Sequence, residues 1–143
     1  RSWTADAREQ TREIVLRDNP APLDTIGIHI YGGAPVTKEV AAWATDRAEY
    51  LRWLKGTARE VRRPVFVGEF GVEATLDAEA DRAGFAELLS AMEDARIDLA
   101  AFWVFDLSFQ RTWNVTLEND RAWMLRMAAE ANRRWARAAP DGR

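Results

Sequence analysis

The sequence contains no cysteine and only one histidine, His29. The absence of cysteine excludes disulfides, thiolate metal sites and cysteine nucleophiles, and a single histidine cannot form a cluster of imidazole ligands. We therefore expect no bound metal, and nothing in the chain indicates an organic cofactor. A chain without cysteine tolerates reducing and oxidising compartments alike, so this absence leaves the localisation open.

Long apolar runs and an excess of charge are also lacking. The longest apolar run, Leu99–Phe105, has the length of a strand, whereas a membrane-spanning helix needs about 20 apolar residues. Twenty Lys and Arg against 23 Asp and Glu give a net charge of -3, so no basic field attracts phosphate backbones. We expect neither a membrane nor a nucleic acid as partner.

The composition that is present is typical of a globular protein. Hydrophobic residues make up 48% and charged residues 30% of the 143 positions, which fits one domain of ordinary size. We expect residues 1–143 to form a single unit. The sequence starts at Arg1 without an initiator Met or an apolar leader, so we expect it to be a processed or truncated product.

Helical and strand-like apolar patterns alternate along the chain. The spacing predicts helices over Thr4–Arg17, Thr37–Arg62, Asp77–Arg96 and Asn119–Ala138, the second and third capped by Thr37 and Asp77. It predicts strands over Asp24–Tyr31, Pro64–Val72 and Leu99–Asp106. Such alternation favours an α/β fold with three parallel strands joined by right-handed helical crossovers.

Side chains alternate across a strand, so parity sorts each predicted strand into two faces. His29 and Tyr31 share one face of the first strand, while Glu69 in the second strand shares its parity with Val65 and Val67. Polar or aromatic groups thus come late in consecutive strands, where α/β proteins bind ligands. We expect these groups to converge with Trp103 of the third strand.

Glu69 lies in an apolar segment, where an unpaired charge is costly and needs hydrogen-bond donors. Tyr31 and His29 can supply these donors, and a carboxylate that is kept ionised can act as a nucleophile or a base. Trp103 offers a flat apolar surface for the C–H face of a sugar ring, and Trp113, in the following loop, can flank a substrate groove. Together these residue types point to carbohydrate chemistry.

Three segments resemble motifs of glycoside hydrolase family 5, the cellulases and mannanases of the retaining (β/α)₈-barrel clan. They are Asp24–Tyr31 (DTIGIHIY), Val67–Gly71 (VGEFG) and Phe102–Asp106 (FWVFD), which resemble strands six, seven and eight of that barrel. The resemblance implies that Glu69 is the nucleophile, that His29 and Tyr31 line the sugar subsite, and that Trp103 stacks on the sugar. It implies retaining hydrolysis of a β-linked oligo- or polysaccharide by a secreted protein.

The resemblance covers only part of a barrel, because a complete one needs about 200 residues or more. We therefore expect a partial, half TIM barrel made of strands six to eight. The acid/base of the family lies in an Asn-Glu pair at strand four, which has no counterpart here, since Glu118-Asn119 is reversed and follows strand eight. This residue would have to come from a missing N-terminal half.

No carboxylate in the chain is expected to lie at the right distance and on the right face to substitute for that acid. Retaining hydrolysis needs two carboxyl groups about 5 Å apart, whereas Glu73 would lie roughly 13 Å from Glu69 along an extended strand. Asp106 has the wrong parity unless the third strand has already ended before it. The isolated chain is therefore expected to be inactive or weakly active.

Two other interpretations stay open. A half-barrel could bind carbohydrate without turning it over, or the chain could be an unrelated flavodoxin-like α/β protein, although it has no Gly-rich phosphate loop after any strand.

An isolated three-stranded sheet would have two free edges and an apolar inner face with Val65, Val67, Ala101 and Phe105. Such surfaces favour association, so we expect a homo-oligomer, by default a dimer, or a complex with a missing half.

Overall fold

The computed structural model describes residues 6–33 and 41–138. In chain order, its elements are α1 (Arg8–Asp18), β1 (Ile26–Gly32), α3 (Arg47–Glu60), β2 (Val65–Val72), α4 (Ala78–Asp94), β3 (Leu99–Phe102) and α5 (Trp123–Ala138). The predicted alternation of helices and strands is therefore confirmed. None of the helices in the described part of the chain is long and apolar enough to cross a membrane.

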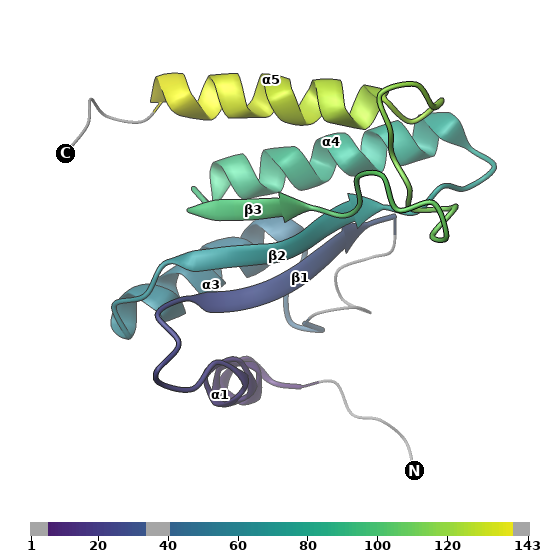
Figure 1. Cartoon of the computed structure of the whole chain (residues 1–143). Coiled ribbons are helices and arrows are strands. Elements are labelled where there is room, and N and C mark those ends of the chain that lie inside the picture. Colours follow the sequence, from purple (N-terminus) through teal and green to yellow (C-terminus); the bar gives the residue numbers. More distant parts are fainter. Residues whose placement is uncertain (1–5, 34–40, 139–143) are drawn as a thin grey trace, which may run out of the picture.

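The three strands form one sheet in the order β1-β2-β3, and both neighbouring pairs are parallel (Figure 1). Parallel neighbours need a crossover connection, which α3 provides between β1 and β2 and α4 provides between β2 and β3. The fold is α/β and is consistent with part of a (β/α)₈ barrel, as predicted.

Several predicted boundaries differ from the structure: α1 begins at Arg8 and α5 at Trp123, each a few residues after its predicted start, and two further differences are larger or affect the site. Helix α3 begins at Arg47 because Asp46 caps it, accepting a hydrogen bond from the Glu49 backbone N–H at 2.7 Å. Residues 41–46 are not helical, and the predicted cap, Thr37, lies outside the described residues. Strand β3 ends at Phe102, so Trp103 follows the strand instead of lying within it.

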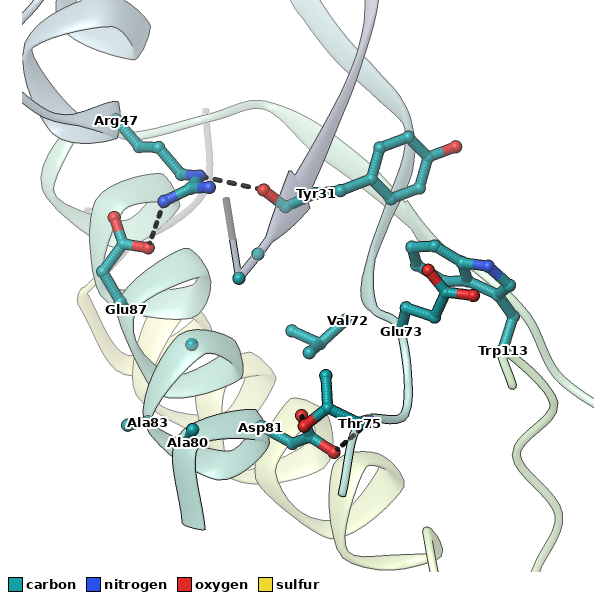
Figure 2. Close-up of a pocket in the computed structure, with 13 residues that line it drawn as sticks. Tyr31, Arg47, Val72, Glu73, Thr75, Ala80, Asp81, Ala83, Glu87 and Trp113 are labelled. Carbon is teal, nitrogen blue, oxygen red and sulfur yellow. Dashed lines mark hydrogen bonds and ion pairs between the residues drawn. The ribbon is translucent and has the colours of Figure 1, made fainter. Parts of the chain in front are cut away.

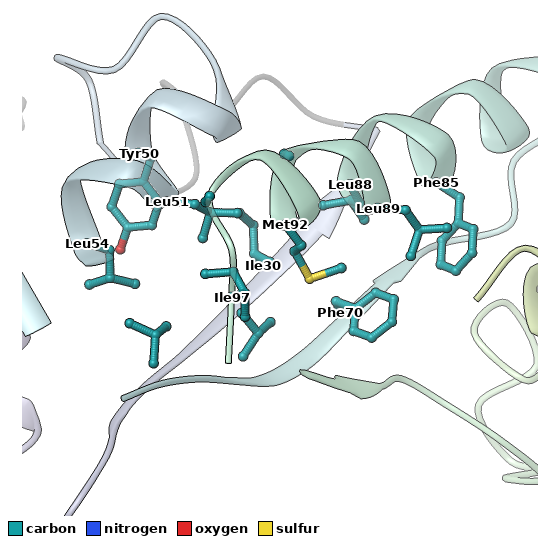
Figure 3. Packing of buried hydrophobic residues seen from close by; sticks show 14 of the residues in the cluster. Ile30, Tyr50, Leu51, Leu54, Phe70, Phe85, Leu88, Leu89, Met92 and Ile97 are labelled. Atoms are coloured by element: carbon teal, nitrogen blue, oxygen red, sulfur yellow. The ribbon is translucent and has the colours of Figure 1, made fainter. Parts of the chain in front are cut away.

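The hydrophobic core lies between one face of the sheet and helices α3 and α4 (Figure 3). Helix α4 contributes Phe85, Leu88 and Met92, all fully buried, and it starts at the predicted cap, Asp77, which accepts hydrogen bonds from two backbone N–H groups. Helix α5 packs on α4, where Trp123 meets the edge of the Phe85 ring at 5.7 Å between ring centroids. One helix thus links the sheet to the C-terminal helix.

A β-bulge in β2 changes the faces that simple alternation predicts. Ile28 of β1 pairs with Val67, but the next residue, His29, pairs with Glu69, so Gly68 is the extra residue. Val65 and Val67 point into the core with 0% exposure, and Glu69 lies on the opposite face. The prediction that all three share one face, and that both valines lie on an open inner face, is wrong because the bulge shifts the period of two.

The face opposite the core is accessible to solvent in the described residues, and we call it the open face. It carries His29, Tyr31, Phe66, Glu69 and Leu99. Phe66 pairs with Leu99 across β2 and β3, and Leu99 is 62% exposed. The open face is therefore polar near the carboxyl ends of the strands and apolar near their beginnings.

Replacing Phe85 tests the packing of the core. Its ring contacts Phe70, Phe102 and Trp123, so Phe85→Ala leaves a cavity among three aromatic rings. We expect the free energy of unfolding to fall by about 3–5 kcal/mol, measured by urea denaturation followed by far-UV circular dichroism.

Phe109→Ala is the matched control, because that ring is 78% exposed. We expect it to change the stability by no more than about 0.5 kcal/mol. Equal effects of the two substitutions would contradict the assignment of Phe85 to the core.

Candidate active site

A carboxylate and two potential donors meet at the open face, near the carboxyl ends of β1 and β2. The Tyr31 hydroxyl donates a hydrogen bond to Glu69 Oε2, and His29 Nδ1 lies 3.4 Å from the same oxygen. His29 and Tyr31 are two residues apart on one strand, and Glu69 is the register partner of His29. The structure thus brings together the predicted nucleophile and the two residues that the sequence analysis expected to supply its hydrogen-bond donors.

The glycine at the bulge makes room for this arrangement. A Cβ atom on Gly68 would lie 3.2 Å from His29 Nε2 and 3.3 Å from His29 Cδ2, which is closer than ordinary van der Waals contact. The imidazole therefore rests on the backbone of the bulge. The same bulge places Glu69 on the face of the sheet that carries Tyr31. The local structure therefore explains why a glycine precedes Glu69.

Burial and charge keep Tyr31 in its protonated form. Desolvation is the main cause, and the hydrogen bond to Glu69 and the charge of that carboxylate add to it, so that the pKa of Tyr31 is raised to about 12. At neutral pH the phenol is therefore a hydrogen-bond donor toward the Glu69 carboxylate oxygen. The Glu69 side chain keeps 22% of its surface exposed, so an incoming ligand can reach it.

Trp113 contacts this group, and Trp103 is held beside β2. The Trp113 ring lies edge-on to the ring of Tyr31, with 5.0 Å between centroids. Trp103 donates its backbone N–H to the Phe70 carbonyl at 2.8 Å, and its indole N–H to Gln110 Oε1 at 2.9 Å. Trp113 thus joins the predicted catalytic residues directly, whereas the stacking role of Trp103 stays a prediction.

Gly71 is required where Trp103 passes β2. A Cβ atom at Gly71 would lie 2.3 Å from the Trp103 carbonyl oxygen, a contact that no side chain can make. The loop that follows β3 can therefore approach the end of β2 closely. This packing brings both tryptophans to the strand that carries Glu69.

Arg47 holds the backbone at Tyr31, a function that the sequence analysis did not predict. It is 7% exposed, its Nε donates to the Tyr31 carbonyl at 2.9 Å, and its Nη1 pairs with Glu87 Oε2 at 2.8 Å (Figure 2). Its only sequence signal is that it lies in the predicted helix Thr37–Arg62 at a position where the helical spacing of Ala44 and Leu51 predicts an apolar residue. Gln110, which holds Trp103, had no signal in the sequence.

A pocket of about 750 Å³ adjoins the site on the side of α4. Its lining includes Tyr31, Arg47, Glu73, Glu87 and Trp113 (Figure 2). Glu69 does not line it, so Tyr31 and Trp113 border both the pocket and the carboxylate site. Among the described residues, no three His, Cys, Asp or Glu side chains gather as a potential metal site.

Comparison with known proteins identifies the fold. No protein-family model and no curated protein matches the sequence. Among solved structures, an endo-1,4-β-mannanase from Rhizomucor miehei matches with a TM-score of 0.57 and 14% identity over 82% of this chain and 31% of its own. An endo-β-1,4-mannanase from Thermotoga petrophila matches with 0.55 and 15%, over 85% of this chain and 28% of its own.

An endo-β-1,4-glucanase from Xanthomonas axonopodis pv. citri also matches, with a TM-score of 0.50 and 22% identity over 78% of this chain and 38% of its own. The chain thus spans about a third of the length of these enzymes. At this level of identity, the comparison shows a similar fold only. The α/β fold of this chain matches one part of each larger enzyme.

The hydrogen bond between Tyr31 and Glu69 can be tested by titration. The chain has two tyrosines, and burial raises the pKa of Tyr50 to about 12 as well, so Tyr50→Phe leaves Tyr31 as the only reporter. In that background we expect Glu69→Gln to lower the pKa of Tyr31, because the negative charge is lost and the amide oxygen of glutamine is a weaker acceptor than a carboxylate. The pKa should stay above 10, its ordinary value, because burial remains.

The measurement is the fraction of tyrosinate, from its ultraviolet absorbance, at each pH between about 9 and 12, and a lowered pKa gives more tyrosinate at a given pH. Glu130→Gln is the matched control, because Glu130 is exposed on α5, an element that contributes no residue to the site. A titration curve that Glu69→Gln leaves unchanged would show that the phenol is not coupled to this carboxylate.

Proposed function

We propose that this chain is the part of a retaining β-glycoside hydrolase that carries the nucleophile, Glu69, and that its substrate is a β-linked oligo- or polysaccharide. The observation that carries the proposal is the single oxygen, Glu69 Oε2, that faces both Tyr31 and His29 at the carboxyl ends of adjacent parallel strands. The fold shared with mannanases and a glucanase supports it.

In the proposed first step, a carboxylate oxygen of Glu69 attacks the anomeric carbon and the bond from that carbon to the leaving oxygen breaks. An acid must protonate the leaving oxygen, and water then hydrolyses the glycosyl ester in the second step. Tyr31 orients the carboxylate by its hydrogen bond, and His29 contacts sugar hydroxyls. Trp103 and Trp113 provide apolar surfaces for the sugar rings.

The acid/base is proposed to lie on a part of the protein outside these 143 residues. In the described part of the chain, the Glu69 side chain is paired with a phenol and an imidazole, neither of which is a second carboxyl group. Natural substrates, whose leaving alcohols need a proton, should therefore react slowly with the chain alone.

The experiment uses a substrate that does not need the acid. In a dinitrophenyl β-glycoside, the leaving phenolate is a weak base and departs unprotonated, and fluorine beside the anomeric carbon slows hydrolysis of the glycosyl ester. We expect fluorinated β-glucoside or β-mannoside reagents to add one sugar to the peptide that contains Glu69, as detected by mass spectrometry. The burst of dinitrophenolate should match the amount of modified protein.

Glu69→Gln should abolish labelling, whereas Glu130→Gln, at an exposed position of α5, should leave it intact. No labelling of the wild type, together with a rise in melting temperature on adding cello- or manno-oligosaccharides, would overturn the catalytic role and favour a carbohydrate-binding one. Label on a carboxylate other than Glu69 would overturn the assignment of the nucleophile.

We further propose that the open face associates, in the isolated chain, with a second copy. Leu99 is 62% exposed beside Phe66, and an edge strand next to an apolar patch favours pairing. We expect wild-type protein at micromolar concentration to sediment as a dimer and Leu99→Glu to shift it toward monomer. Leu117→Glu, at a position that is 73% exposed in the loop before α5, is the control, and a monomeric wild type would contradict this proposal.

A further inference from the structure

We propose that Arg121 is a positioning residue, which fixes the loop that carries Trp113 to the end of β2 and so sets the environment of Tyr31. This inference rests on the proposed function for its catalytic meaning, whereas its geometry stands on contacts that are independent of that function.

The guanidinium of Arg121 joins two separate segments. One Nη donates to the carbonyl of Val72, the last residue of β2, and the other donates to the carbonyl of Thr112, the residue before Trp113. The side chain also packs on Met124, with 3.2 Å between Nη2 and Sδ. One side chain thus ties the strand of Glu69 to the loop of Trp113.

Other contacts converge on the same junction. The Ala74 backbone N–H donates to the Thr112 carbonyl at 2.7 Å, and the Thr112 hydroxyl donates to Glu73 Oε1 at 2.8 Å. Thr112 is therefore held on its backbone and on its side chain by residues that directly follow β2. Trp113 leaves this fixed point and places its ring 5.0 Å from that of Tyr31.

The burial of Arg121 indicates that its placement is specific. The residue is 6% exposed, and loss of solvent lowers the pKa of its guanidinium, while the charges of Asp81, Asp120 and Glu73 act in the opposite direction. Removing an arginine from water is costly unless its donors are used. The planar guanidinium donates to two carbonyl oxygens at once. The single ammonium of lysine cannot reproduce this geometry.

Trp113 is the link from Arg121 to the chemistry. Burial is the largest cause of the raised pKa of Tyr31, and the Trp113 ring packs against the Tyr31 ring. If the loop lost its tie to β2, Trp113 would move, Tyr31 would gain solvent, and its hydrogen bond to Glu69 would loosen. Arg121 itself has no contact with Glu69 among the described hydrogen bonds and ion pairs, so it acts through the loop.

The test compares Arg121→Lys with Arg111→Lys. Both changes keep the charge, but Arg111 is exposed in the same loop, so it controls for the loop's composition. The protein is labelled with 5-fluorotryptophan, which gives one fluorine resonance for each tryptophan, and Trp113→Phe assigns the resonance of Trp113. We expect Arg121→Lys to shift or broaden that resonance while the resonances of Trp43 and Trp53, remote from the loop, stay in place.

A second readout is the titration of Tyr31 in the Tyr50→Phe background. Arg121→Lys should lower the pKa of Tyr31, and Arg111→Lys should not change it. Arg121→Met, which keeps an apolar stem without donors, should have the larger effect on both readouts. If that variant does not fold, the lysine variant alone decides the outcome.

An unchanged Trp113 resonance in Arg121→Lys would overturn the proposal, as would equal shifts of all tryptophan resonances, which indicate a general loss of structure. With the fluorinated glycoside, we expect Arg121→Lys to slow labelling of Glu69 about 10-fold or more, the scale of a misplaced active-site group. If the wild type is not labelled at all, the proposed function fails, while the fluorine spectra and the titration still decide the role of Arg121.

Discussion

The extra residue at Gly68 decides which side chains of β2 face the core and which face solvent. Before it, Val65 and Val67 are buried against the helices; after it, Phe70 and Val72 are buried, and Glu69 faces the other way. Without the bulge, either the valines or the carboxylate would lie on the wrong side. A single unpaired glycine thus reconciles a continuous core with a polar site on one short strand.

Charged side chains fix the ends of the strands in this fold. Arg47 binds the carbonyl of Tyr31 at the end of β1, and Arg121 binds that of Val72 at the end of β2. Asp98 accepts from the Val65 N–H at 2.8 Å at the start of β2 and pairs with Lys55 at 2.6 Å. Although burial would raise the pKa of Asp98, the hydrogen bonds from Lys55 and Val65 hold it below its ordinary value. The acceptor at the start of β2 therefore stays charged at neutral pH.

Much of the fold could be predicted from the sequence, because its elements follow from local periodicity and caps. The order of elements, the parallel sheet and the cap at Asp77 depend on apolar spacing and on one side chain, which are visible without the structure. The faces of β2 were not predictable by alternation, since one inserted residue inverts the parity of everything after it. The start of α3 was not predicted correctly because apolar residues at helical spacing, such as Ala44, continue on the N-terminal side of the helix.

The candidate site was predictable where polar residues end apolar strands, as at His29, Tyr31 and Glu69. It was not predictable where a distant side chain holds a backbone carbonyl, since neither Arg47 nor Arg121 carries a motif. A hydrogen bond to a main-chain carbonyl requires no particular residue type at the accepting position. No sequence pattern therefore predicts such a bond. Such contacts become visible only when the loops are placed in space.

The sheet order also has a consequence for how the chain folds. Each strand pairs with the strand that follows it in the sequence. The two strands of each pair are therefore separated in the sequence by one helix and its loops. The entropy of closing a loop grows only slowly with its length, and contacts between consecutive units shorten the search. Each strand-helix-strand unit can therefore form as it leaves the ribosome, and synthesis from the N-terminus matches the order of assembly.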